Sequence, residues 1–319
     1  MSVSDMRRTL GLKVPLVLAA TVAGGLPPAA RPITAADELP SFAGEQLSRV
    51  IPRSGERLPA VGMGTWITFN VGNNQAARAA RLEVLKAFFA NGGGLIDSSP
   101  MYGSAQAVVG DLLGRLNHPK TLFAATKVWT RSAPEGVAQI ETARALWGLE
   151  RFDLYQVHNL LNWQAHLPHL QALVEAGSLR YAGLTTSHGR RHDDLLELMQ
   201  RTPLDFVQLT YNPLDREAEA RLLPMALDKG IAIIVNRPFR RGQLIDALAG
   251  EPLPAVAAEL QCESWAQLLL KWVLSHPAVT CVIPATTQVA HMEQNMAAGR
   301  GRLPDAAERE LIARAVTSA

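Results

Sequence analysis

The chain of 319 residues contains few of the features that would point to a metalloprotein or a nucleic-acid-binding protein. Its two cysteines, Cys262 and Cys281, form no CxxC pair and no Cys/His cluster, so no zinc site is indicated. The net charge is only +2 and the arginines are scattered, which gives no reason to expect nucleic acid as a partner. We expect both cysteines to be buried and to pack as small hydrophobic residues. A disulfide between them is possible only if the protein is exported to an oxidising compartment.

A hydrophobic run long enough to span a membrane is also missing. The apolar run from Val14 to Ala23 is far shorter than the ~20 residues that a membrane-spanning helix needs, and it contains Pro15. We therefore expect no stable membrane span. The run follows the basic pair Arg7 and Arg8 and leads into a stretch rich in Gly, Pro and Ala.

A basic start, a short apolar run and small residues after it are the layout of a secretory signal. The paired arginines resemble a twin-arginine export signal. We expect residues 1–31 to be such a leader, recognised by the twin-arginine export machinery, and residues 32–44 to be a linker. The protein would then be periplasmic. The alternative is a disordered basic leader on a cytoplasmic enzyme.

Residues 45–319 have a folded composition, since the whole chain is 48% hydrophobic and 19% charged. Eight short apolar runs, nearly continuous rather than alternating, indicate strands that are covered on both faces. These runs are 58–66, 94–98, 121–128, 153–158, 181–185, 206–210, 231–235 and 280–284. The stretches between and after them favour helices, at 76–90, 105–116, 134–149, 165–176, 190–200, 217–229, 264–275 and 289–298, with one more at 304–316.

Strict alternation of strand and helix predicts an α/β fold, a single-domain (β/α)8 TIM barrel with the N-terminal leader outside it. The competing fold is an open, doubly wound sheet. No GxGxxG motif opens the first strand-to-helix turn, which argues against a Rossmann domain. The segment 44–58, with Ser54, Gly55 and Glu56 as its turn, is expected to form a hairpin that closes the barrel bottom.

Polar residues follow several of the predicted strands, where the active sites of barrels lie. Asp97, Lys127 and His158 end three of these strands, and Tyr102 follows Asp97 closely. A carbonyl that receives hydride develops negative charge and needs a proton, which a tyrosine with an ordinary pKa near ~10 can donate. We expect Lys127 to lower that pKa, Asp97 to hold Lys127 by an ion pair, and His158 to orient the carbonyl.

Each of these residues has another interpretation when taken alone. A lysine after an apolar strand could form a Schiff base, as in barrel aldolases. Asp97 and His158 could be structural, and Tyr102 could be a packing residue of a turn. Their joint placement at the strand ends is what favours catalysis.

Three motifs carry a family resemblance: LIDSSPMYGS at 95–104, ATKV at 125–128 and DLYQVH at 153–158. In this order they resemble the aldo-keto reductase family, over residues 49 to 298. The resemblance implies the (β/α)8 barrel, a catalytic tetrad of Asp97, Tyr102, Lys127 and His158, and NADPH as cofactor, with NADH possible. It also implies a small-molecule carbonyl substrate, an aldehyde or ketone that is reduced to an alcohol with Tyr102 as general acid.

The same resemblance implies a set of cofactor-binding residues after strands five to eight. They are Thr185, Thr186, Gln208, Asn236, Arg237, Pro238, Arg240, Thr286, His291, Gln294 and Asn295.

Several of these positions depart from the family pattern. Thr185 and Thr186 replace a Ser-Asn pair, and Asn236 stands where an aromatic residue stacks on the nicotinamide. Ala285 and His291 replace a lysine and an arginine that hold the 2′-phosphate of NADPH. A strict preference for NADPH is therefore in doubt.

For the substrate pocket the sequence suggests Trp66, Trp129 and His188. The histidine pairs 166/169 and 188/192 have no HExxH-type carboxylate beside them, so no metal is expected. The favoured function is an NAD(P)H-dependent reductase. The alternative from another class is a nicotinamide-binding regulatory or sensor module with little turnover.

Overall fold

Eight short strands form one parallel sheet whose order follows the chain. The computed structural model describes residues 44–318, so the predicted leader and nearly all of the predicted linker lie outside the described residues. The strands are β3 (Met63–Gly64), β4 (Leu95–Asp97), β5 (Phe123–Val128), β6 (Leu154–Val157), β7 (Tyr181–Thr185), β8 (Phe206–Thr210), β9 (Ala232–Asn236) and β10 (Val279–Val282). The amide of Gly62 donates to the carbonyl of Val282 and the amide of Val282 to that of Ala60, which joins the last strand to the first. The predicted (β/α)8 barrel is confirmed.

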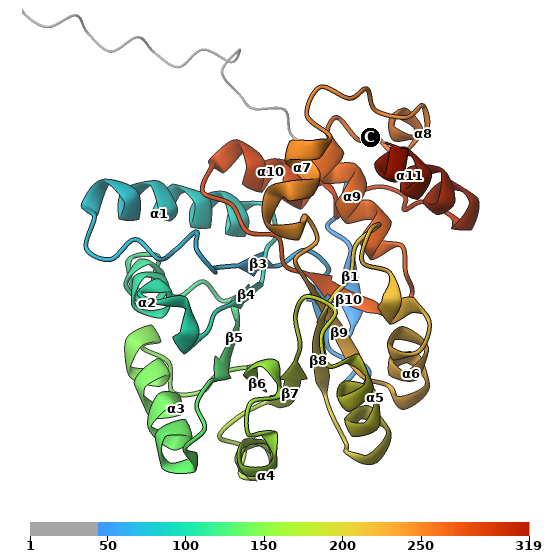
Figure 1. Cartoon of the computed structure of the whole chain (residues 1–319). Coiled ribbons are helices and arrows are strands. Elements are labelled where there is room, and N and C mark those ends of the chain that lie inside the picture. Colours follow the sequence, from blue (N-terminus) through green and yellow to red (C-terminus); the bar gives the residue numbers. More distant parts are fainter. Residues whose placement is uncertain (1–43, 319) are drawn as a thin grey trace, which may run out of the picture. The chain divides into compact units, whose positions relative to one another are not determined.

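Helices alternate with the strands and lie around the outside of the barrel (Figure 1). They are α1 (Gln75–Ala90), α2 (Ala105–Arg115), α3 (Ala133–Trp147), α4 (Trp163–Glu175), α5 (His192–Arg201), α6 (Leu222–Lys229), α9 (Trp265–Leu274), α10 (Val289–Ala297) and α11 (Ala306–Ser318). Side chains of Asn74, Ser132 and Ser264 cap the first turns of α1, α3 and α9 by accepting backbone N–H groups, which fixes where these helices begin.

Two helical features differ from the sequence expectation. The helix expected at 217–229 is split into a 3-10 turn (Glu217–Glu219) and α6, because the backbone of Arg221 is not helical and Pro224 suits the first turn of a new helix. The segment after β9 contains two short helices that were not expected, α7 (Gln243–Ala247) and α8 (Val256–Glu259).

A two-stranded antiparallel hairpin precedes the barrel, as predicted. It pairs β1 (Ser48–Val50) with β2 (Arg57–Pro59), and its turn contains Gly55 at a φ of 75°, a conformation that glycine adopts without strain. Ile51 and Leu58 of this segment pack into the hydrophobic cluster formed by the inward-facing strand residues. The hairpin therefore closes the amino-terminal end of the barrel.

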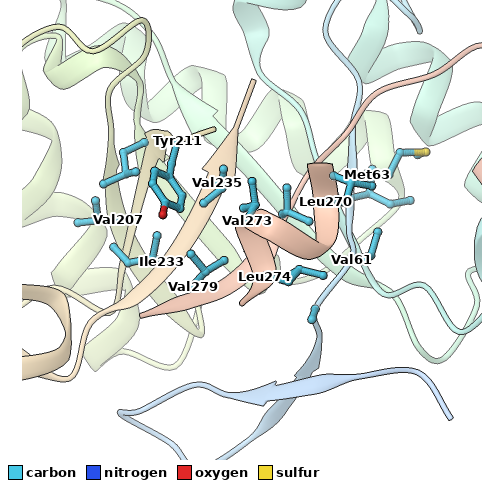
Figure 2. Close-up of a cluster of buried hydrophobic side chains, with 14 of the residues drawn as sticks. Val61, Met63, Val207, Tyr211, Ile233, Val235, Leu270, Val273, Leu274 and Val279 are labelled. Atoms are coloured by element: carbon cyan, nitrogen blue, oxygen red, sulfur yellow. The ribbon is translucent and has the colours of Figure 1, made fainter. Parts of the chain in front are cut away.

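Two separate hydrophobic clusters reflect the period-two alternation of the strands. The inner cluster fills the barrel toward the amino-terminal ends of the strands, and its members include Leu95, Phe123, Leu154, Tyr181, Phe206 and Ile234. The outer cluster lies between strands and helices. Figure 2 shows part of it, where Leu270, Val273 and Leu274 of α9 gather with outward-facing strand residues such as Val235 and Val279. Burial on both faces explains the nearly continuous apolar runs.

Both cysteines are buried and free, so Cys262 and Cys281 form no disulfide. Within residues 44–318 no helix is long and apolar enough to cross a membrane. The same residues contain no group of three or more His, Cys, Asp or Glu side chains placed to hold a metal ion. His166, from one of the two histidine pairs, instead hydrogen-bonds through Nε2 to the carbonyl of Thr130.

Candidate active site

The inward-facing side chains change from apolar to polar near the carboxyl ends of the strands. On β4 and β5 the inward positions step by two residues from Leu95 to Asp97 and from Phe123 through Ala125 to Lys127. Gln156, in register with Lys127, continues the same layer on β6. Because the strands are parallel and in register, these polar groups meet at one end of the barrel.

Lys127 and Asp97 form a buried ion pair at the centre of this layer. The Lys127 ammonium donates to Asp97 Oδ2 at 2.5 Å and to the carbonyl of Ser98 at 2.9 Å, and both side chains are almost completely buried. It also donates to the Tyr102 hydroxyl at 3.3 Å. The structure therefore brings together three of the four predicted catalytic residues in direct contact.

The pKa of Lys127 shows that this contact keeps the side chain charged. Burial alone would lower the pKa, but the charge of Asp97 and the contact with Tyr102 outweigh burial and raise it above the usual value. A protonated ammonium is not nucleophilic, so this environment argues against the Schiff-base alternative.

The pKa of Tyr102 is raised, which differs from the net effect expected from the sequence. Lys127 does pull the pKa down, but burial of the phenol raises it more, and the charge of Asp97 adds to that increase. The sequence indicated the lysine but not how deeply the hydroxyl would be buried. The result is a tyrosine that holds its proton and can donate it.

His158 is buried beside Tyr102, and their rings meet edge to face with centroids 5.6 Å apart. Burial, followed by the charge of Lys127, holds the pKa of His158 well below 6.5, so the imidazole is neutral at pH 7. Ser99 Oγ lies 2.8 Å from Nδ1 and already accepts the Met101 amide. Among the described residues His158 Nδ1 is the only acceptor within reach of the Ser99 hydroxyl proton, so donation to Nδ1 satisfies both groups, and it leaves the imidazole proton on Nε2.

The second carboxylate oxygen of Asp97 is held by two amides. Gln156 Nε2 and Gln208 Nε2 each donate to Asp97 Oδ1 at 3.1 Å. Gln208 Oε1 in turn accepts from Asn236 Nδ2 at 3.3 Å, and Asn236 Oδ1 accepts from the Thr210 hydroxyl at 2.6 Å. The predicted cofactor residues Gln208 and Asn236 thus belong to a hydrogen-bond network that reaches the ion pair.

A cleft of about 830 Å³ opens above this layer. It is lined by most of the residues predicted from the sequence, on both sides of Tyr102. These are Trp66, Asp97, Tyr102, His158, Thr185, Thr186, His188, Gln208, Asn236, Arg237, Pro238, Thr286, His291, Gln294 and Asn295. Lys127 does not line the cleft, because it lies beneath Tyr102 and is almost completely buried.

Besides Lys127, two further predicted residues lie outside the cleft lining. Trp129 is 41% exposed, and its backbone groups bond to the side chain of Gln139, so this tryptophan is not part of the pocket. Arg240 makes a bidentate ion pair with Asp215, at 2.9 and 2.7 Å, and does not face the cleft. Its neighbour Arg241 lines the cleft instead.

The cleft contains polar atoms suited to a nucleotide. The Thr186 hydroxyl and Arg237 Nη1 are buried there without a hydrogen-bond partner among the described residues. A buried hydroxyl and a buried guanidinium nitrogen each lose free energy unless a ligand satisfies them, and an amide and a phosphate are groups that do so. Thr185 differs, because its hydroxyl already accepts the Asn159 amide at 3.0 Å.

Two residues of the site were not identified from the sequence. Gln156 carries a signal that could have found it, since it lies two residues before His158 and therefore faces inward with it. Ser99 carries no such signal, because nothing in the local pattern places its hydroxyl against a residue 59 positions later.

The structure is a closed parallel barrel whose ionisable groups gather at the carboxyl ends of the strands. This is the arrangement found in barrel enzymes. The chain belongs to the aldo/keto reductase family, whose model matches residues 60–311. This confirms the resemblance of the three motifs and identifies an NAD(P)H-dependent oxidoreductase.

The relatives cover most of the chain at low identity. Methylglyoxal reductase YeaE of Escherichia coli (strain K12) is 28% identical over 255 residues, which is 78% of this chain and 88% of that protein. An aldo/keto reductase from Klebsiella pneumoniae, solved in complex with NADP and acetate, has a TM-score of 0.70 and 25% identity, covering 83% of this chain and 94% of that one. The glycerol dehydrogenase AKR11B4 from Gluconobacter oxydans, at 18% identity and a TM-score of 0.71, shares the fold over 85% of this chain and 95% of its own.

Proposed function

We propose that the protein reduces an aldehyde or ketone to an alcohol with NADPH, and that Tyr102 is the general acid. The observation that carries this proposal is the Tyr102 hydroxyl, which borders the cleft while it contacts the buried Lys127–Asp97 pair. The raised pKa keeps the proton on Tyr102 until a stronger base, the developing alkoxide, accepts it.

The nicotinamide, when bound, supplies the hydride. The chain's own residues then position the carbonyl and provide the proton. His158 Nε2–H donates a hydrogen bond to the carbonyl oxygen, because Ser99 occupies Nδ1. Tyr102 donates its proton to the same oxygen, and the Lys127 ammonium stabilises the phenolate that remains.

The cofactor-binding half of the cleft fits a nicotinamide dinucleotide. The unpartnered Thr186 hydroxyl suits the carboxamide, and Arg237 suits a phosphate. Two solved structures, both from Klebsiella pneumoniae, are described as complexes with NADP and with NADPH, which supports NADPH here. NADH is a second possible cofactor, because Ala285 and His291 line the cleft where the family's lysine and arginine would stand.

The test is a carbonyl panel assayed with NADPH and with NADH. The panel includes methylglyoxal, the substrate named for the Escherichia coli relative. We expect wild-type turnover, and a loss of at least about a thousandfold in kcat for Tyr102→Phe with unchanged NADPH affinity, since the proton donor is gone while the cleft is kept. Identical behaviour of the two proteins would refute Tyr102 as general acid. Tight NADPH binding without turnover on any carbonyl would instead establish the sensor alternative.

We also propose that residues 1–31 act as a twin-arginine export leader in front of the barrel of residues 45–319, so that the enzyme acts in the periplasm. The proposal is supported by Arg7 and Arg8 ahead of a short apolar run. Fractionation of cells that express the full chain, beside a variant with both arginines changed to lysine, tests it. Export that is blocked in the variant is the expected result. A wild-type protein confined to the cytoplasm would contradict it.

A further inference from the structure

The loop after β9 turns two neighbouring arginines in opposite directions. Arg240, Arg241 and Gly242 follow one another at φ values of 48°, 65° and 95°, all in the left-handed region. Arg240 bonds to Asp215 outside the cleft, whereas Arg241 lies over Trp66, with its guanidinium carbon 4.7 Å from the ring centroid. Positive φ values are unfavourable for arginine, so two in succession indicate that the backbone of the folded loop fixes where the Arg241 side chain lies.

Arg241 has no anionic partner in the part of the chain that the structure describes. It forms no ion pair and no hydrogen bond there, and Asp215 is already neutralised by Arg240. Carboxylates that line the cleft further along the loop, such as Asp246 and Glu251, form no ion pair with it either. Arg241 is therefore a cation without an ion-pair partner in a cleft lining that also contains the carboxylates of Asp246, Glu251 and Glu263. The pKa of His188 is lowered by burial and then by the surrounding arginines, which is consistent with such a charge.

The contact with Trp66 places Arg241 in the part of the cleft lining that also contains Tyr102. The Trp66 ring on which it lies is 6.4 Å from the Tyr102 ring, centroid to centroid, and both rings line the cleft. Arg237, the other arginine in the lining, lies next to Asn236 at the end of β9, where the predicted cofactor residues begin. The cleft lining thus contains two arginines at different places: Arg237 lies beside the predicted cofactor residues, and Arg241 lies over Trp66.

We propose that Arg241, held over the ring of Trp66, binds an anionic group of the substrate, so that the enzyme prefers carbonyl compounds that carry a carboxylate or phosphate. A guanidinium stacked on an indole keeps its N–H edge free, and that edge matches a carboxylate or phosphate with two parallel hydrogen bonds. This inference rests on the proposed carbonyl reduction.

The kinetic test compares pairs of aldehydes in which a carboxylate of one member replaces a methyl group of the other. Succinic semialdehyde is paired with butanal, and 4-carboxybenzaldehyde with 4-methylbenzaldehyde. We expect wild-type kcat/KM to favour the anionic member by about two- to fivefold, the range of one partly exposed ion pair. Arg241→Gln should bring this ratio close to one. Arg201→Gln, which removes an exposed arginine paired with Glu197 on α5, is the matched charge control and should leave the ratio unchanged.

A second measurement separates the substrate's anion from the pyrophosphate of the cofactor. We expect the Kd of NADPH, from titration of tryptophan fluorescence, to change less than twofold in Arg241→Gln. An unchanged substrate ratio together with weaker NADPH binding would overturn the proposal, since Arg241 would then hold the cofactor. A wild-type ratio near one would overturn it as well.

Calorimetry with benzoate and benzamide on the NADPH-loaded protein keeps the inference testable without turnover. Benzoate should bind more tightly than benzamide to the wild type and equally weakly to Arg241→Gln. If this holds while no carbonyl is reduced, the anion site stands and the proposed reaction fails. If benzoate and benzamide bind the wild type alike, the anion site fails, whatever the turnover.

Discussion

Ser99 is the residue whose replacement tests the geometry of the site most directly. Its hydroxyl lies 2.8 Å from His158 Nδ1, and by donating to that nitrogen it keeps the proton of this cleft-lining imidazole on Nε2. In Ser99→Ala the buried Nδ1 loses its partner, and the tautomer with the proton on Nδ1 is no longer disfavoured. A lost hydrogen bond to a buried group is worth about 1–2 kcal/mol. If the transition state loses this full amount of stabilisation, kcat/KM should fall about five- to thirtyfold.

The matched control is Ser98→Ala, because Ser98 is the adjacent serine, equally buried, and bonds to Thr65 rather than to His158. Its kcat/KM should fall less than threefold. Nitrogen chemical shifts of the imidazole distinguish a role in setting the tautomer from a role as cap of the turn that carries Tyr102. Equal losses in the two variants, or an unchanged His158 tautomer in Ser99→Ala, would refute the reasoning.

Three further predictions follow from burial. Because burial holds the pKa of Tyr102 above 10.0, kcat for reduction should be level from pH 6 to about pH 9, and a decline centred near pH 7 in stopped-flow assays would contradict this. The pKa of His158 lies well below 6.5 in the folded protein. As the pH falls below 6.5, this histidine therefore binds a proton in the unfolded chain before it does so in the folded chain. Acid should therefore lower the free energy of unfolding by up to about 1.4 kcal/mol per pH unit, measured in urea, and His158→Gln should lose less. Burial raises the pKa of Cys262 to about 11 and that of Cys281 above its usual value, so neither thiol should react with Ellman's reagent until denaturant exposes both; rapid native labelling would show that one is accessible.

The catalytic layer could be predicted from the sequence because strands impose a fixed geometry. Asp97, Lys127 and His158 each end an apolar run, and the carboxyl ends of parallel strands share one end of the barrel. Two-residue periodicity then decides which side chains face inward. The positions of these strand-end residues can be predicted without knowing the loops. The hairpin at 44–58 was likewise predicted from its own turn residues.

The loop residues could not be assigned in the same way. Whether Arg240 or Arg241 faces the cleft depends on consecutive left-handed backbone angles, which arginine does not signal. Trp129 follows Lys127 closely in the chain, yet β5 ends at Val128, and the tryptophan after it is exposed and lies outside the cleft lining. The pKa of Tyr102 escaped prediction for a related reason, because its balance of burial and charge depends on the depth of the hydroxyl in the folded chain.

Asn236 illustrates how a departure from a family pattern can change the role of a position. From the sequence it indicated only the loss of an aromatic surface for the nicotinamide. In the structure its amide donates to the Thr186 carbonyl at 2.9 Å and to Gln208 Oε1, and Gln208 donates to Asp97. An aromatic side chain cannot make these bonds, so the asparagine exchanges a stacking contact for support of the buried carboxylate. The cofactor half and the proton-donating half of the cleft are therefore joined by one polar network, and a change at Asn236 must act on both.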